Sequence, residues 1–191
     1  MSTALEQHIL EANSRYANAY NSAGLNIQPA NKLVISKLHI LFGRKASPLT
    51  IFFTTVTCMD CRLDPAAAYG FKLGDTTIVR NAGASARDGA RSALLTTHVL
   101  GAEDIYIIKH TKCGLLGVTT EMAHGIIKKN LGLANSTEDL DNFEVFPIAD
   151  LEESLKEDVA YLRHHPLAMK KVRVTGWIHD TDTGVLKQVV Q

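Results

Sequence analysis

The sequence predicts an α/β protein in which a largely parallel sheet is flanked by helices. Short apolar, β-prone runs alternate with helix-like segments from about residue 51 to the end, and this alternation is typical of parallel sheets. Composition is that of an ordinary globular protein, with 46% hydrophobic and 21% charged residues. A chain of 191 residues can bury a substantial core within one domain. We therefore expect a single domain over residues 1–191.

The N-terminal part divides into a predicted helix and two less regular stretches. Apolar residues recur at mainly three- to four-residue spacing within residues 3–20, which predicts an amphipathic helix. Gly and Pro mark residues 21–31 as a loop. Residues 33–50 are apolar but interrupted by Gly and Pro, and their pattern favours neither a strand nor a helix.

Two strands separated by a helix are predicted next. Ile51–Thr57 is apolar and β-prone, as expected of a buried strand. Asp64 can cap a helix in which Pro65 occupies the first turn. Thr77–Arg80 predicts the second strand, and the small residues at 81–85 predict a turn after it.

Helices and strands continue to alternate in the second half. Residues 87–100 predict a helix whose inward face carries Ala90, Leu94, Leu95 and Val99. The later expected elements are a strand at Ile105–Lys109, a helix near 119–130, a polar loop at 132–142, a helix at Leu151–His164, and strands at Val172–Trp177 and Val185–Val190. A short polar turn joins the last two strands, so we expect an antiparallel hairpin at the end of the sheet.

Charge and composition exclude several classes of function. Lys plus Arg equals Asp plus Glu at 20 each, and no basic stripe is visible, which argues against nucleic acid or an anionic membrane as a partner. No run reaches the ~18 apolar residues of a membrane span, and no signal-peptide pattern opens the chain. Three cysteines are too few for a disulfide framework, and thiolate ligands persist best in a reducing compartment, so we expect a cytoplasmic protein.

Potential metal ligands follow two of the predicted strands. The first cluster is Cys58-Met59-Asp60-Cys61-Arg62, and the second is His110-Thr111-Lys112-Cys113. Ligands at the carboxyl ends of two neighbouring parallel strands would converge on one point. Zinc favours thiolate and imidazole ligands in tetrahedral geometry, and Cys58, His110 and Cys113 supply three of them. A fourth position would then be open to water, whose pKa zinc lowers to about 7.

Two charged residues of the first cluster suit a catalytic metal. Asp60 could accept a hydrogen bond from a zinc-bound hydroxide and so aim its lone pair. Arg62 could pair with Asp60 in a bidentate arrangement and hold it ionised.

Two other interpretations of the clusters stay open. Cys58 and Cys61, together with His110 and Cys113, could form a closed structural Cys₃His zinc site. Alternatively, Cys58 and Cys61 could be a redox Cys-x-x-Cys pair. If the chain stays extended past the strand, residues 58, 60 and 62 share one side and Cys61 points away, which favours the open site.

These residues carry a resemblance to a known family. Cys58-x-Asp60-x-Arg62, followed by His110-x-x-Cys113-Gly114, resembles the signature of β-class carbonic anhydrases. Further matching segments occur in the same order: Leu63-Asp64-Pro65, Arg80-Asn81-Ala82-Gly83, Leu100-Gly101, and Gly176-Trp177-Ile178-His179-Asp180 with Thr183-Gly184 and Leu186. The resemblance extends from about residue 51 to the end of the chain.

The resemblance implies a β-carbonic-anhydrase-like fold, with four parallel strands and a fifth antiparallel strand. It also implies a homodimer or a dimer of dimers, in which the N-terminal helix and loop (residues 1–31) lie across the partner. Residues 33–50 look like an insertion relative to compact members. Cys61 and Lys112 depart from the residues usual at their positions.

The resemblance further implies roles for individual residues. Zinc ligands are expected at Cys58, His110 and Cys113, and the activating pair at Asp60 and Arg62. In some members the matching aspartate becomes a fourth zinc ligand in a closed state, so Asp60 is a candidate for that role. Gly83 is expected near the substrate pocket.

The function expected from the residues and the resemblance together is that of a zinc lyase. Such an enzyme reversibly hydrates carbon dioxide to bicarbonate with a zinc-bound hydroxide. The same site would also suit a hydrolase of carbonyl sulfide or carbon disulfide, and the metal signature does not separate the two. A lesser alternative is a non-catalytic domain held together by a structural Cys₃His zinc.

Overall fold

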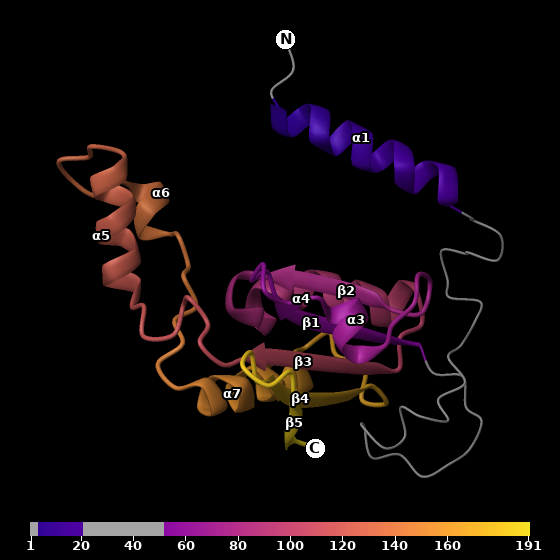
Figure 1. The fold of residues 1–191 in the computed structure, drawn as a ribbon. Helices are drawn as coiled ribbons and strands as arrows, with labels where there is room; N and C mark the ends of the chain where they lie inside the picture. The colour runs from indigo at the N-terminus through magenta and orange to yellow at the C-terminus, as the bar shows by residue number, and fades with distance from the viewer. Residues whose placement is uncertain (1–3, 21–51) are drawn as a thin grey trace.

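A five-stranded sheet forms the centre of the protein (Figure 1), as a computed structural model shows for residues 4–20 and 52–191. The strands lie in the order β2-β1-β3-β4-β5, and only β5 runs antiparallel to its neighbour. Their bounds are β1 (Phe53–Cys58), β2 (Thr77–Asn81), β3 (Asp104–His110), β4 (Arg173–His179) and β5 (Leu186–Val190). This confirms the predicted fold class and the terminal hairpin. The predictions for residues 21–31 and 33–50 lie outside the described residues.

The helices begin and end close to where the sequence predicts. Their bounds are α1 (Ala4–Ala19), α3 (Pro65–Tyr69), α4 (Ala86–Val99), α5 (Thr120–Asn130), α6 (Glu138–Asp141) and α7 (Leu151–His164), with a short 3-10 turn η1 (Ala82–Ala84). The Asp64 carboxylate accepts a hydrogen bond from the backbone N–H of Ala67, and Pro65 opens the helix, as expected. The polar loop predicted at 132–142 contains one helical turn that the sequence did not indicate, because Thr137 caps α6.

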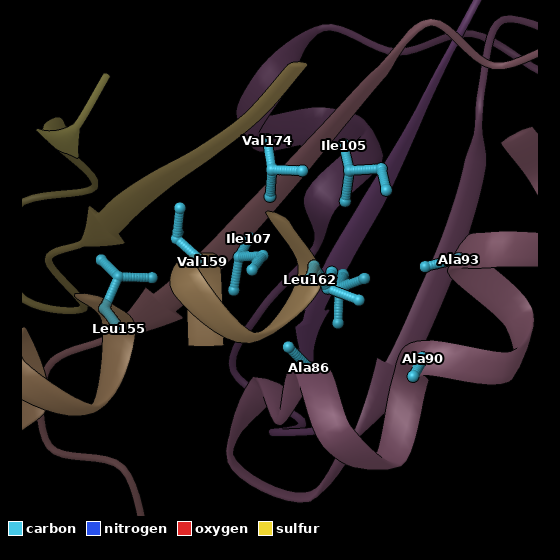
Figure 2. Packing of buried hydrophobic residues seen from close by; sticks show 10 residues of the cluster. Ala86, Ala90, Ala93, Ile105, Ile107, Leu155, Val159, Leu162 and Val174 are labelled. Carbon is cyan, nitrogen blue, oxygen red and sulfur yellow. The ribbon is translucent and has the colours of Figure 1, made fainter. Parts of the chain in front are cut away.

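Helices α4 and α7 cover one face of the sheet. Figure 2 shows three small side chains of α4 turned toward the larger aliphatic side chains of α7 and of the strands. The α4 residues are Ala86, Ala90 and Ala93; opposite them lie Ile105, Ile107, Leu155, Val159, Leu162 and Val174. Alanines allow the helix to approach the sheet closely, so the contact excludes water without long side chains.

One part of the prediction for α4 was wrong. Ala90 and Leu94 are buried as expected, but Leu95 is 45% exposed and Val99 is 62% exposed. The buried stripe instead follows the three- to four-residue spacing of one helix face, and Leu95 and Val99 lie off that stripe.

Aromatic residues fill the other face of the sheet, beneath α3. Phe53 stacks edge-on against Phe71 and Tyr106, with ring centroids 5.2 Å apart in both pairs. Trp177 is 2% exposed in the same cluster. The two faces therefore have separate cores, one aliphatic and one aromatic, which hold β1 and β3 firmly in the middle of the sheet.

Helix α1 differs from the other helices in its surroundings. It stands apart from the sheet (Figure 1), and its larger apolar side chains are exposed. These side chains are Leu5, Ile9, Leu10 and Tyr16, with Tyr20 just beyond the helix. Within residues 4–20 and 52–191, none of the helices combines the length and hydropathy of a membrane span.

Candidate metal centre

Three potential metal ligands meet at one edge of the sheet. Cys58 is the last residue of β1, and His110 is the last residue of its parallel neighbour β3, so both strands deliver a ligand at their carboxyl ends. Cys113 lies in the turn that follows β3. The ligand atoms of the three residues lie within 4.8 Å of one another, and all three side chains are buried. The predicted convergence is confirmed.

Cys61 lies outside this group. Its side chain is exposed, whereas the two other cysteines are buried. The chain does not stay extended past Cys58, however, because the backbone N–H of Leu63 donates to the Asp60 carbonyl at 3.1 Å and closes a turn. Cys61 thus points away because of a turn, and the extended geometry assumed from the sequence was wrong.

The His110 imidazole is arranged to offer one nitrogen as a ligand. Its Nδ1 lies 2.9 Å from the carbonyl oxygen of Thr111. A carbonyl can only accept, so Nδ1 carries a proton and Nε2 is the nitrogen left to bind a metal ion. Nε2 is buried and has no hydrogen-bond partner among the described residues. A metal ion at the group would satisfy this atom.

The electrostatics of the two buried thiols also suit a cation. Burial raises the pKa of Cys58, but His110 and the backbone N–H groups of Asp60 and Gly83 outweigh that effect and lower it to about 7. Burial raises the pKa of Cys113, and the negative charges of Cys58 and Asp60 raise it further. A divalent cation would relieve that repulsion. Two thiolates and one imidazole are a donor set typical of zinc, so the residues fit the metal.

Asp60 and Arg62 form a bidentate pair beside the group. Arg62 Nε donates to Asp60 Oδ1 at 2.9 Å, and Nη2 donates to Oδ2 at 2.7 Å. The Arg62 side chain and its backbone N–H hold the pKa of Asp60 well below the usual range. Asp60 Oδ2 lies 3.7 Å from His110 Nε2, although Asp60 is not one of the three clustered ligands. An ionised carboxylate thus lies next to the point where the ligands meet.

Known proteins are similar in sequence to this chain over most of its length. A family model described as carbonic anhydrase matches residues 53–186. Beta-carbonic anhydrase 1 of Mycobacterium tuberculosis is 30% identical over 148 residues, which cover 77% of this chain and 87% of that protein. The chain belongs to the β-carbonic anhydrase family.

Other relatives of this member of the β-carbonic anhydrase family are named carbon disulfide hydrolases. A carbon disulfide hydrolase of Acidithiobacillus thiooxidans is 36% identical over 151 residues, covering 68% of this chain and 73% of that protein. Among solved structures, a carbonic anhydrase of Streptococcus mutans superimposes with a TM-score of 0.79 at 30% identity, over 99% of both chains. The apo form of a carbon disulfide hydrolase gives a TM-score of 0.60 at 29% identity, over 73% of this chain and 78% of that chain.

The structure adds residues that the sequence did not single out for the site. Arg80 Nε donates to the Cys58 carbonyl at 3.1 Å, and Nη2 donates to the Asp60 carbonyl at 2.7 Å. Arg62 Nη2 donates to the Lys112 carbonyl at 2.8 Å, which ties the first cluster to the second. These bonds use main-chain oxygens, so no residue pattern at the accepting positions could have indicated them.

Gly83 lies against the group, as part of the buried η1 turn. Its φ is +70°, a backbone conformation that residues other than glycine rarely adopt. A Cβ there would lie 2.9 Å from Cδ1 of Ile148. Both the backbone conformation and the packing against Ile148 therefore favour glycine in the turn beside Cys58 and Cys113.

Proposed function

We propose that this chain is a zinc enzyme that reversibly hydrates carbon dioxide to bicarbonate, with Cys58, His110 and Cys113 as the zinc ligands. The observation that carries the proposal is the buried Cys-His-Cys group beside an ionised Asp60 that Arg62 holds in place. The likeness to a solved carbonic anhydrase over nearly the whole of both chains supports this substrate.

Bound zinc would supply a Lewis acid that lowers the pKa of water to about 7. Asp60 is ionised throughout the physiological pH range, so it can accept a hydrogen bond but has no proton to give. Its role is to orient the attacking oxygen by accepting a hydrogen bond from that oxygen's O–H group. Arg62 fixes both carboxylate oxygens and thereby the direction of that hydrogen bond.

The reaction needs one water and one carbon dioxide. The water oxygen forms a bond to the carbon, and the π electrons of one C=O bond move to the oxygen atom of that bond. One proton of the water leaves for solvent or buffer. The product is bicarbonate. Reversal takes up the same proton, so the residues that orient the oxygen serve both directions.

Hydrolysis of carbon disulfide is the second candidate, because the 36% identical relative bears that name. The substrate is again linear, neutral and electrophilic at carbon. Two waters convert carbon disulfide into carbon dioxide and two hydrogen sulfides, with carbonyl sulfide as the product after the first. The same orienting pair would serve each attack. A structural Cys₃His site has less support, because Cys61 is exposed and outside the ligand group.

The deciding experiment assays the purified full chain after its zinc has been quantified. Carbon dioxide hydration is followed by stopped-flow acidification, and hydrogen sulfide release is followed from carbon disulfide and from carbonyl sulfide. We expect about one zinc per chain and rapid hydration. Sulfide release with no hydration would replace the first proposal by the second, and zinc without either activity would refute both.

A further inference from the structure

A buried cation lies directly before His110, on the opposite face of β3. Alternation along the strand turns Lys109 toward α7, on the same face as Ile105 and Ile107. The Lys109 side chain is 3% exposed, and its Nζ lies 2.8 Å from Oδ2 of Asp158, itself 11% exposed. Nζ also donates to the Gly83 carbonyl at 3.0 Å. One ammonium therefore joins α7 to the η1 turn across the end of β3.

The Gly83 peptide connects this cation to the metal centre. Gly83 belongs to the η1 turn, which packs against the strand that ends in Cys58. Ala84, the next residue of the turn, packs in one buried cluster with Cys58 and Cys113. Lys109 holds the carbonyl of Gly83, the residue directly before Ala84, so the position of the ammonium sets how the turn meets Cys58.

Stability alone does not account for a buried charge pair at this place. Taking two charges out of water costs about as much as their attraction returns, and well-packed apolar residues of similar volume usually serve the fold equally well. What the pair supplies that apolar residues cannot is a directional, charge-assisted hydrogen bond to one chosen carbonyl. That carbonyl belongs to the turn beside Cys58.

We propose that Lys109 and Asp158 are positioning residues for the metal centre, which fix the Gly83 turn against Cys58 and thereby set the affinity of the site for zinc. The inference rests on the proposed function only in taking Cys58 as a zinc ligand. Neither residue touches the ligand atoms, and the effect is transmitted through the Gly83 peptide.

The test compares two double variants of the full chain. Lys109→Met with Asp158→Leu removes the pair at similar volume. Arg173→Met with Asp104→Leu removes the matched pair at the other end of β3, where Arg173 Nε lies 3.0 Å from Asp104 Oδ1 and Asp104 is fully buried. Zinc dissociation constants are measured by competition with a chromophoric chelator. Cobalt is then substituted, and its thiolate charge-transfer and d–d bands are recorded.

We expect the first variant to bind zinc about 10- to 100-fold more weakly, the range typical when groups that support metal ligands are lost. Its cobalt bands should shift. The second variant should keep the parent affinity and bands. A folded first variant with parent-like affinity and spectrum would overturn the inference, as would equal losses in both variants. Fluorescence of the single buried tryptophan, Trp177, reports folding in each case.

Asp158→Asn provides the second measurement if the first double variant does not fold. This substitution keeps the shape of the side chain and one oxygen acceptor but removes the negative charge opposite Lys109. It should therefore weaken zinc binding by a smaller factor than the first double variant does. Parent-like affinity in this variant would also overturn the inference. A parent chain that binds zinc tightly without activity would refute the proposed function and leave this test intact, whereas a parent chain that binds no zinc would refute both.

Discussion

Asp60 is held in place by several independent contacts, and each has a separate physical effect. Arg62 fixes the carboxylate from its side chain and from its backbone N–H, while Arg80 fixes the Asp60 carbonyl. The side-chain contacts determine charge and direction, and the main-chain contact determines where the residue lies. When Asp60 is substituted, we expect the carboxylate to change while Arg80 still holds the main chain in place.

We expect Asp60→Asn to lower kcat for carbon dioxide hydration by about 10²-fold or more, because a misdirected nucleophile loses at least that factor. Zinc content and unfolding midpoint should stay at parent values. Stopped-flow kinetics measure kcat, elemental analysis measures zinc content, and urea denaturation followed by Trp177 fluorescence measures the unfolding midpoint. Asp139→Asn on exposed α6 serves as the control and should change neither. Full turnover in the Asp60 variant would exclude the orienting role.

The two cysteines of the first cluster should respond in opposite ways to replacement by serine. Cys58→Ser removes a buried ligand atom, so we expect loss of most bound zinc and of activity. Cys61→Ser alters an exposed side chain and should leave both unchanged. Zinc quantification after gel filtration distinguishes them. Zinc loss in the Cys61 variant would favour the closed structural site.

Whether the sequence could indicate a residue of the site depended on whether that residue acts through its side chain or its main chain. Cys58, His110 and Cys113 could be found from residue type and position after a strand, since zinc chemistry restricts the choice. Lys109 carried a weaker signal, a charge at the end of an apolar strand, and its partner Asp158 is far away in sequence. The hydrogen bonds to the Gly83 and Lys112 carbonyls had no signal.

Helix α7 packs so closely on β4 that a single added methyl group can test the contact. A Cβ on Gly176 of β4 would lie 3.0 Å from Cγ of Leu155 and 3.0 Å from Cγ2 of Val159, both on α7. These leucine and valine atoms belong to the buried core, so they would have to shift by a few tenths of an ångström where little free space exists. Because α7 carries Asp158, its seating on the sheet also matters for the site.

Gly176→Ala should lower the free energy of unfolding by about 1–3 kcal/mol, the usual cost of an added core methyl group. Urea denaturation followed by Trp177 fluorescence measures it. Gly125→Ala in α5 is the matched control, since nothing lies within 4 Å of its added Cβ. That substitution should raise stability by about 0.4–1 kcal/mol, because it restricts the unfolded chain. Equal effects at both positions would contradict the packing argument.

The elements predicted best were those with the strongest periodic or apolar pattern. All four parallel strands could be located, because each is a short run rich in β-branched or aromatic residues. The inward face of α4 was partly wrong, since apolarity alone does not say which side of a helix meets the sheet, as Leu95 and Val99 show. Helix α6 was missed because a single capped turn with acidic residues has the composition of a loop.

For the whole molecule, the exposed apolar side chains of α1 suggest assembly. Within one chain, Leu5, Ile9 and Tyr16 remain more than half exposed. Such a surface on a helix that stands apart from the sheet is typical of a segment that packs on another subunit (Figure 1). We propose a homodimer in which α1 lies across the partner.

The variant Leu5→Ser, Ile9→Ser, Tyr16→Ser should therefore shift the sedimentation equilibrium mass toward that of a monomer. Burial of three large side chains is worth several kcal/mol at about 25 cal/mol per Å², enough to weaken association by orders of magnitude. Trp177 fluorescence should show an intact core. A variant that retains the parent mass would mean that α1 is not the dimer contact.

The distribution of the proposed zinc ligands along the chain has a consequence for biosynthesis. Cys58 leaves the ribosome well before His110 and Cys113, and β3 must pair with β1 before the three side chains meet. During that interval its thiol is unprotected from oxidants and competing ions. If the chain binds zinc as proposed, metal loading is a late event of maturation, and we expect cells short of zinc to accumulate a fully synthesised but oxidation-sensitive precursor.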